Sequence, residues 1–221
     1  MQLDEVMAAL KAAGNDKVKK LDVRSGAGEN QFGVKSGDIR ILAKKLKGQP
    51  ELVSQLWDTS NADAMLLAVL LMNPKQITAA ELEKRVRSIT FTNLADWLDS
   101  YVTKVHPENE ALREKWMKST HPMLLRAGWS LTARRVEKEP AGLELKALLD
   151  RIEKEMDAAP LVVQWTMNYC LAQIGIHFPE HRKRALAIGE KLGVFRDYPT
   201  SKGCTSPFAP IWINEMVRRQ G

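Results

Sequence analysis

Apolar residues recur at spacings of three and four along most of the chain, and no stretch alternates apolar and polar residues as an amphipathic strand does. This pattern predicts an all-α protein. Helices are expected at residues 2–13, 36–47, 50–58, 61–72, 78–89, 93–105, 109–119, 122–138, 143–157, 161–177, 180–192 and 209–219. Prolines such as Pro122 fall at a first helical turn or just past a helix end, where proline is tolerated. Residues 21–38 and 196–210 lack the periodicity and are expected to be irregular.

Three of the predicted helices resemble one another, in the segments "ADAMLLAVLLMNP", "THPMLLRAGWSLTARRVEKEP" and "AAPLVVQWTMNYCLAQIGIHFPEH". Met123 and Leu161 hold corresponding positions 38 residues apart. A two-helix repeat of about 40 residues has the length of a HEAT-like unit, and such units stack into a solenoid with one concave surface. We expect a single domain over residues 1–221, with a C-terminal loop and a short capping helix in 196–221. An irregular helical bundle is the alternative.

The charge balance favours a polyanionic partner, because the net charge is +6. Residues 1–48 carry ten Lys and Arg against six acids, and residues 182–221 carry eight against three, whereas the middle of the chain is slightly acidic. Two basic ends could contact a phosphate backbone at separate points. Solvated helix faces explain the same charges equally well.

The chain lacks the sequence signals of a membrane span, a secretory signal or a metal site. Its longest apolar run, residues 64–72, is far shorter than the roughly 20 residues of a span. Cys170 and Cys204 lie far apart and fit no zinc-ligand spacing, which also favours a reducing compartment. We expect a soluble, cytoplasmic monomer without metal or cofactor. Cys204 is expected to pack beneath the C-terminal helix, with a reactive thiol as the alternative.

The predicted helix 93–105 carries two acids beside its apolar face. Asp96 and Asp99 are neighbours on one strip of the helix, and two carboxylates this close raise the proton affinity of one of them. A solvated helix face is the ordinary alternative. Trp97 lies roughly 200° around the helix from Asp99 and is expected to pack. The predicted core face consists of Phe91, Leu94, Leu98, Tyr101 or Val102, and Val105.

Two further helices carry candidate binding residues. Arg126 stands among apolar residues in "PMLLRAGW" and must reach solvent or find a partner, for which a carboxylate such as Asp99 or a phosphate is suited. Trp165 and Tyr169 lie one turn apart on helix 161–177. That spacing is more typical of core packing than of a ligand platform.

Four segments, in this order, resemble the AlkD-like DNA alkylation repair proteins: "FGVKSGDIRILAKKL", "ADWLDSYV", "PMLLRAGWSLTARRVEK" and "VVQWTMNYCLAQIG". The resemblance covers most of residues 20–195. It implies an array of HEAT-like repeats that binds double-stranded DNA on a basic concave face, and association with the nucleoid when bound. It also implies a monofunctional glycosylase that removes cationic N3- and N7-alkylated purines without metal or cofactor.

The resemblance assigns roles to particular residues. The family's catalytic aspartate matches Asp99, its DNA-contacting arginine matches Arg126, and an active-site tryptophan falls at Tyr169. A second family tryptophan falls at Ala95, and Trp165 is the candidate to replace that lost aromatic face. The residues expected to contact DNA phosphates are Lys35, Arg40, Arg134, Arg135 and Lys138.

The alanine at position 95 keeps a second hypothesis open: a non-catalytic HEAT-repeat protein that binds distorted or branched DNA. A helical scaffold for another protein, with incidental basic ends, is a third. Salt-sensitive binding to duplex DNA would separate the first two from the third. Release of alkylated purines would separate the first from the second.

Overall fold

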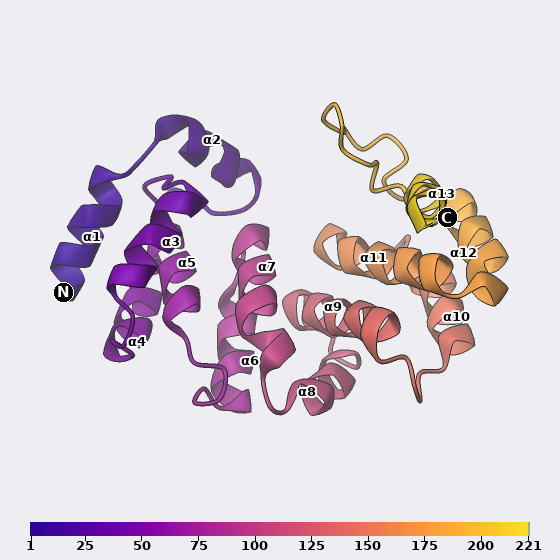
Figure 1. The fold of residues 1–221 in the computed structure, drawn as a ribbon, viewed down its shortest axis with the longest axis horizontal. Helices are drawn as coiled ribbons and strands as arrows, with labels where there is room; N and C mark the ends of the chain where they lie inside the picture. Colours follow the sequence, from indigo (N-terminus) through magenta and orange to yellow (C-terminus); the bar gives the residue numbers. More distant parts are fainter. Residues whose placement is uncertain (221) are drawn as a thin grey trace. The chain divides into compact units, whose positions relative to one another are not determined.

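The computed structural model describes residues 1–220, and within them the chain forms thirteen α-helices, one short 3-10 turn and no strand (Figure 1). The all-α prediction is therefore confirmed. The helices form two compact units, of which unit 1 is Met1–Asn109 and unit 2 begins at Glu110. The expectation of a single domain over residues 1–221 stays a prediction.

Unit 1 is built around one buried helix. Its helices are α1 (Leu3–Ala12), α2 (Asp16–Arg24), α3 (Ser36–Lys45), α4 (Glu51–Asp58), α5 (Ala62–Leu71), α6 (Ala79–Ser88) and α7 (Thr92–Tyr101), followed by the 3-10 turn Thr103–Val105. Helix α5 packs against α3, α4 and α7 (Figure 1). Leu66, Leu67 and Val69 lie on different sides of this helix and are all buried, as expected for a helix that is apolar all round.

Asp63, in the first turn of α5, is the main polar element of this core and is only 1% exposed. Its carboxylate accepts hydrogen bonds from the backbone N–H groups of Phe32 (2.6 Å), Gly33 (3.1 Å) and Val34 (2.8 Å). Gly33 has a φ of 73°, and a Cβ atom there would lie 2.5 Å from the Asn15 carbonyl oxygen. Asp63 therefore fastens the segment that leads into α3 onto α5.

Helix α2 corrects the prediction that residues 21–38 are irregular, because the first four of them complete this helix. None of the α2 residues is buried, so the helix has no apolar stripe that periodicity could reveal. It is stabilised at its start instead, where the Asn15 side chain accepts hydrogen bonds from the backbone N–H groups of Lys17 (3.0 Å) and Val18 (3.2 Å).

Helix α7 ends earlier than predicted, at Tyr101 rather than at residue 105. The backbone of Val102 leaves the helical region with φ −125° and ψ −63°, and the Thr103 hydroxyl donates to the Leu98 carbonyl at 3.3 Å. Val102 is fully buried as a result, whereas Tyr101 and Val105 are exposed and do not join the core. The buried face of α7 is otherwise the predicted one.

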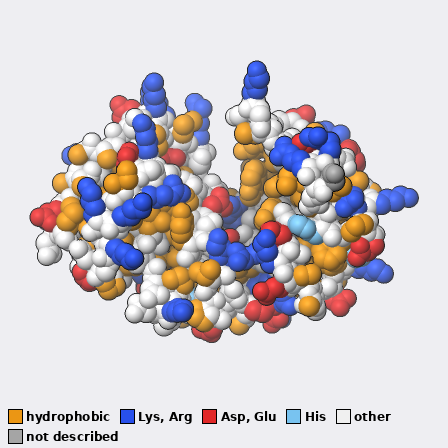
Figure 2. Space-filling model, viewed as in Figure 1, with side chains coloured by type: hydrophobic (Ala, Val, Ile, Leu, Met, Phe, Trp, Pro, Cys, Tyr) orange, Lys and Arg blue, Asp and Glu red, His pale blue; other side chains and the backbone are white. Residues whose placement is uncertain are grey.

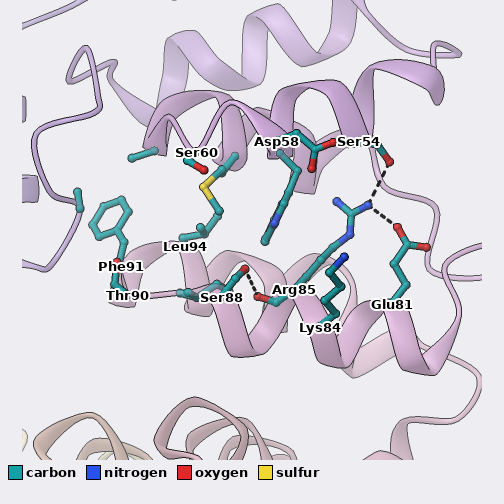
Figure 3. A pocket seen from close by; sticks show the side chains of 15 residues that line it. Ser54, Asp58, Ser60, Glu81, Lys84, Arg85, Ser88, Thr90, Phe91 and Leu94 are labelled. Carbon is teal, nitrogen blue, oxygen red and sulfur yellow. Dashed lines mark hydrogen bonds and ion pairs between the residues drawn. The ribbon is translucent and has the colours of Figure 1, made fainter.

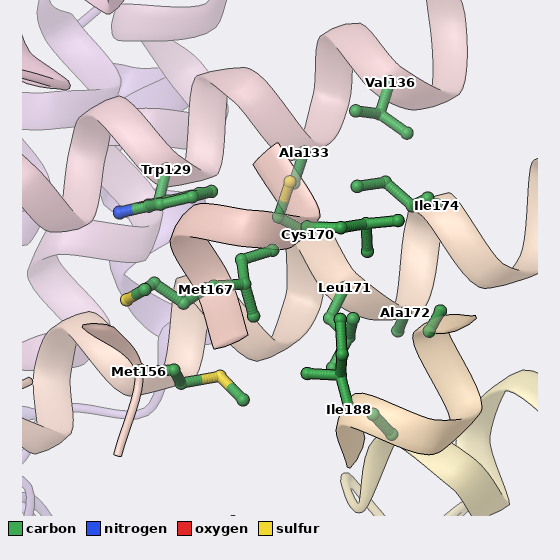
Figure 4. Packing of buried hydrophobic residues seen from close by; sticks show 14 of the residues in the cluster. Trp129, Ala133, Val136, Met156, Met167, Cys170, Leu171, Ala172, Ile174 and Ile188 are labelled. Atoms are coloured by element: carbon green, nitrogen blue, oxygen red, sulfur yellow. The ribbon is translucent and has the colours of Figure 1, made fainter. Parts of the chain in front are cut away.

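Unit 2 is built around a hydrophobic core. Its helices are α8 (Asn109–Trp116), which starts at the last residue of unit 1, α9 (Pro122–Lys138), α10 (Leu145–Glu155), α11 (Leu161–His177), α12 (Pro179–Leu192) and α13 (Ala209–Gln220). Helix α11 packs against α9, α12 and α13. Trp129 of α9, Met167 and Leu171 of α11 and Ile188 of α12 belong to this core (Figure 4). The predicted bounds of α9 and α11 agree with the structure.

Asp22, on α2, is expected to destabilise unit 1 at neutral pH. Partial burial, and then the charge of Asp63, raise its pKa above the ordinary value of 3.8. The folded state therefore favours the protonated acid, and stability is lost as the pH rises through the folded-state pKa. Asp22→Asn should raise the melting temperature by roughly 1–3 °C at pH 7. It should have no effect at pH 3, where both states are protonated. An equal gain at both pH values, measured by circular dichroism, would contradict this.

Candidate nucleic-acid interface

Asp99 lies on the α7 helix in unit 1 and is half-buried, whereas Asp96, one turn earlier, is exposed. The two acids therefore differ in their surroundings, although the sequence presents them as a pair. Ala95, to which the resemblance assigns the position of a family tryptophan, is also half-buried. Partial burial leaves the Asp99 carboxylate less hydrated than that of Asp96, which suits a charge that acts on a bound cation.

Helix α7 is held at both of its ends. Before its first turn, the Thr90 hydroxyl donates to the Gly26 carbonyl at 3.1 Å, and Gly26 has a φ of 90° and no room for a Cβ atom beside Thr90. Beyond its last turn, His106 Nδ1 accepts from the Glu108 N–H at 3.1 Å, so its Nε2 carries the proton and donates to the Ile77 carbonyl at 3.0 Å. A helix fastened in this way can hold a side chain in one orientation.

Arg40 lies on the indole of Trp97, with its guanidinium carbon 4.6 Å from the ring centre. Its Nε donates to the Tyr101 hydroxyl at 3.3 Å. Trp97 is buried, as predicted for a packing residue, while Arg40 and Tyr101 are exposed. The sequence predicted Arg40 as a phosphate contact and left open whether Tyr101 or Val102 joins the core, and it is Val102 that does so. Lys35, at the start of α3, is exposed as well.

Arg126 lies on α9 in unit 2 and is only 4% exposed. Its Nη1 donates to the Val162 carbonyl in the first turn of α11 at 2.8 Å, so the side chain links these two helices. The sequence indicated that this arginine needs a hydrogen-bonding partner, and the structure gives it a backbone carbonyl group. A carboxylate or phosphate at the same guanidinium stays a prediction.

Tyr169 and Trp165 have different surroundings on α11. Tyr169 is half-buried and stacks on Trp212 of α13, with ring centres 5.7 Å apart and an angle of 27° between the planes. Trp165 is 36% exposed and contacts Phe195 and Tyr198 in the loop that follows α12. The interpretation of these two residues as a core pair is therefore wrong for Trp165.

The three basic residues predicted near the end of α9 divide into two kinds. Arg134 and Lys138 are exposed, and the Lys138 ammonium pairs with the Glu137 carboxylate at 2.6 Å. Arg135 is half-buried; it forms an ion pair with Glu110, and its Nη2 donates to the Ala141 carbonyl at 2.7 Å beyond the end of α9. Arg135 therefore stabilises the C-terminal end of its own helix. On the face drawn in Figure 2, Lys and Arg side chains are spread over both units.

A pocket of about 550 Å³ lies in unit 1 among residues of α4 to α7 (Figure 3). Its lining includes Ser54, Trp57, Asp58, Glu81, Lys84 and Arg85. Arg85 is buried over the Trp57 ring at 5.0 Å, and its Nη2 donates to Glu81 and to the Ser54 hydroxyl. None of the residues predicted to act on DNA lines this pocket. The Glu81–Arg85 spacing of four was the only signal of it in the sequence.

The two cysteines lie in opposite surroundings. Cys170 is fully buried in the core of unit 2, and burial raises the pKa of its thiol far above the usual range. Cys204 is exposed, so the expectation that it packs beneath the C-terminal helix is wrong. Among residues 1–220, no three His, Cys, Asp or Glu side chains come together as a metal site would need.

No helix formed by residues 1–220 has both the length and the apolar character needed to cross a membrane.

The fold is that of the HEAT-like helical-repeat proteins. A solved structure with a TM-score of 0.81 and 26% identity covers 100% of this chain and 95% of its own, and it is described as representing "a new family of proteins related to the HEAT-like repeat DNA glycosylases with affinity for branched DNA structures". The all-α, HEAT-like prediction is thus confirmed, whereas a basic concave face stays a prediction.

The sequence profile described as "DNA alkylation repair enzyme" matches residues 6–211, and the chain belongs to this family. The resemblance to this family is therefore confirmed. Among curated relatives, the chain is 25% identical to the uncharacterized protein Lin0241 of Listeria innocua, over 98% of this chain and 97% of the relative. It is 24% identical to the uncharacterized protein Lmo0209 of Listeria monocytogenes, with the same coverage of 98% and 97%.

Proposed function

We propose that this protein binds double-stranded DNA and hydrolyses the N-glycosidic bond of cationic N3- or N7-alkylpurines. The supporting observation is a half-buried carboxylate, Asp99, on the fastened helix α7 of a chain that belongs to the DNA alkylation repair family. Asp99 occupies the position that the resemblance gives to the catalytic aspartate.

The chemistry requires little from the protein beyond one placed charge. Alkylation makes the purine a cation, so the base leaves with the bonding electron pair as a neutral molecule. The deoxyribose develops an oxocarbenium-like charge, which the ionised Asp99 carboxylate stabilises. Asp99 also orients the water molecule that adds to the anomeric carbon, and this water passes its proton to the solvent. The departing base needs no general acid because its positive charge already activates it.

The remaining site residues are assigned to DNA contact. Arg126 holds a backbone phosphate, and Tyr169 and Trp165 present aromatic surfaces on α11. The sequence-independent phosphate contacts are Lys35, Arg40, Arg134, Arg135 and Lys138. Among these, Arg135 contributes least to DNA affinity, because its guanidinium already pairs with Glu110 and donates to a carbonyl group beyond the end of α9.

The direct test is base release from alkylated duplex DNA. Duplex treated with a methylating agent is incubated with the protein, and free 7-methylguanine and 3-methyladenine are separated by chromatography. Release well above the spontaneous rate supports the proposal. Spontaneous rates together with tight duplex binding would overturn the enzymatic part.

The exposed basic pair on α9 gives a prediction about DNA binding. The double variant Arg134→Ala/Lys138→Ala should lower duplex affinity by roughly tenfold, equally for all sequences, and reduce the slope of log K against log salt by about 2. Fluorescence anisotropy at several salt concentrations measures both. Lys146→Ala/Lys154→Ala removes the same charge from exposed positions on α10 and should leave the slope unchanged. If the two double variants gave the same slope of log K against log salt, the basic residues of α9 would not contact DNA.

A second candidate function is binding of distorted or branched DNA without base release. Ala95 in place of the family's tryptophan favours it, as does the affinity for branched DNA stated for the structurally similar protein. The two functions separate in one experiment, since a non-catalytic protein would bind a DNA junction more tightly than a linear duplex and leave alkylated purines in place.

A further inference from the structure

Unit 2 carries a cluster of three aromatic side chains at its surface, Trp165, Phe195 and Tyr198, which we call the aromatic platform. Trp165 lies 5.3 Å from Phe195 and 5.7 Å from Tyr198 between ring centres, and Phe195 lies 5.8 Å from Tyr198. Trp165 is 36% and Tyr198 46% exposed. Aromatic rings that pack on one another and yet face solvent are available for a further ring to stack on.

The platform lies on an apolar patch and not at the edge of the core. Leu161, one turn before Trp165 on α11, is 74% exposed, while Thr166 and Met167 next to Trp165 are buried. Leu161 and Trp165 therefore present apolar surface to solvent on the first turns of α11, with the half-buried Gln164 next to Trp165. Patches of this kind mark binding surfaces more often than accidental exposure.

The loop that carries Phe195 and Tyr198 is fastened on both sides. The Arg196 guanidinium donates to the Glu190 carbonyl oxygen (2.9 Å) and carboxylate (3.0 Å) and lies over the Phe208 ring at 4.7 Å. Further along, the Asn168 amide donates to the Pro207 carbonyl at 2.8 Å. Phe195 and Tyr198 therefore belong to a loop whose conformation is fixed by side-chain contacts.

Phe195 itself adopts a left-handed backbone conformation, with a φ of 64°. A bulky residue other than glycine adopts this conformation only when the surroundings enforce it, and such residues cluster at functional sites. The conformation coincides with the contact of the Phe195 ring with both Trp165 and Tyr198. The backbone is thus held in a disfavoured state at the residue that completes the platform.

The charges around the platform suit a nucleic acid. Lys202 and Arg196 are exposed on the same loop, where Arg196 pairs with the exposed Glu190 and the other exposed acid is Asp197. Residues 182–221, which include this loop, carry eight Lys and Arg against three acids. Flat exposed rings on a segment with an excess of basic residues favour a phosphate-linked base over an apolar peptide.

We propose that the aromatic platform stacks an unpaired nucleobase of bound DNA. This inference rests on the proposed function in so far as it requires DNA binding, and it extends it by naming unpaired bases as a recognised feature. A base inside a duplex presents only its edges, because its faces are covered by neighbouring pairs. A ring face can therefore stack only on a base at a gap, a branch point or a displaced strand.

The test compares two DNA ligands with one set of variants. Wild-type protein, Tyr198→Ala, Tyr198→Phe and Trp165→Ala are titrated by fluorescence anisotropy against a linear duplex and against the same duplex with a five-nucleotide single-stranded gap. Both alanine variants should bind the gapped DNA roughly tenfold more weakly, and Tyr198→Ala should bind the duplex as wild type. Tyr198→Phe keeps the ring and should match wild type on both. Ile211→Ala, an exposed apolar residue on α13, is the matched control and should change neither affinity.

Each outcome supports or overturns one statement. Equal loss by Tyr198→Ala on both ligands, or no loss on either, overturns the platform while DNA binding stands. Absence of all DNA binding by wild-type protein overturns the platform and the proposed function together. If the alanine variants lose affinity for gapped DNA alone, the platform is supported. If the wild-type protein also releases no alkylated base, only the proposed glycosylase activity is overturned. Circular dichroism of Trp165→Ala shows whether α11 stays folded, and Tyr198→Ala, on a loop, provides the same test independently.

Discussion

Asp99→Asn should reduce the release of alkylated purines by about 100-fold or more and leave duplex affinity within about twofold of wild type. The substitution keeps the shape of the side chain but removes the negative charge that opposes the developing sugar cation. An amide can still orient water, so the expected loss comes from electrostatics. Single-turnover kinetics on methylated duplex measures the chemical step apart from binding and product release.

The matched control for this experiment lies on the same helix. Asp96→Asn makes the same change one turn earlier, at an exposed position, and should leave the rate of base release near that of wild type. Equal losses in the two variants would mean that the general negative charge of α7 matters and not the placed carboxylate at position 99. An unchanged rate in Asp99→Asn would remove this residue from the chemistry.

The largest effect on stability is expected at Asp63. Asp63→Ala leaves the N–H groups of Phe32, Gly33 and Val34 without their acceptor in a buried place, which should cost roughly 3–5 kcal/mol in the free energy of unfolding. Asp63→Asn keeps one carbonyl oxygen and should lie between this variant and wild type. Urea denaturation followed by circular dichroism measures both.

Asp16→Ala provides the comparison for Asp63. Asp16 also lies in the first turn of a unit 1 helix, but it is exposed, so its loss removes only a favourable charge at a helix start. That contribution is typically below about 1 kcal/mol. If Asp63→Ala were no more destabilising than Asp16→Ala, the segment before α3 would be held by other contacts.

The sequence predicted the helices that bury a continuous apolar face and missed what depends on polar contacts. Helices α9 and α11 were bounded correctly because each combines a long apolar pattern with a proline at or just before its first turn. Helix α2 was missed because it buries no residue and depends on Asn15 at its start. Helix α7 was extended too far because the apolar spacing continues through Val105, and no glycine or proline marks its end.

The candidate site shows the same division. Arg126 could be predicted to need a partner, since a buried guanidinium among apolar residues is costly. Its bond to the Val162 carbonyl could not, because that contact depends on how α9 and α11 pack. Likewise, the exposure of Trp165 depends on the path of the loop after α12, and periodicity within α11 carries no information about that path.

The contrast between the two cysteines has a practical consequence. Since the Cys170 thiol is sealed in the core of unit 2 and Cys204 is exposed, a maleimide reagent at neutral pH will attach a single dye to the unmodified sequence. The label will sit on the same loop as Tyr198, six residues further along the chain. A dye on Cys204 can therefore report the binding of nucleic acid at this loop in real time, without an engineered cysteine.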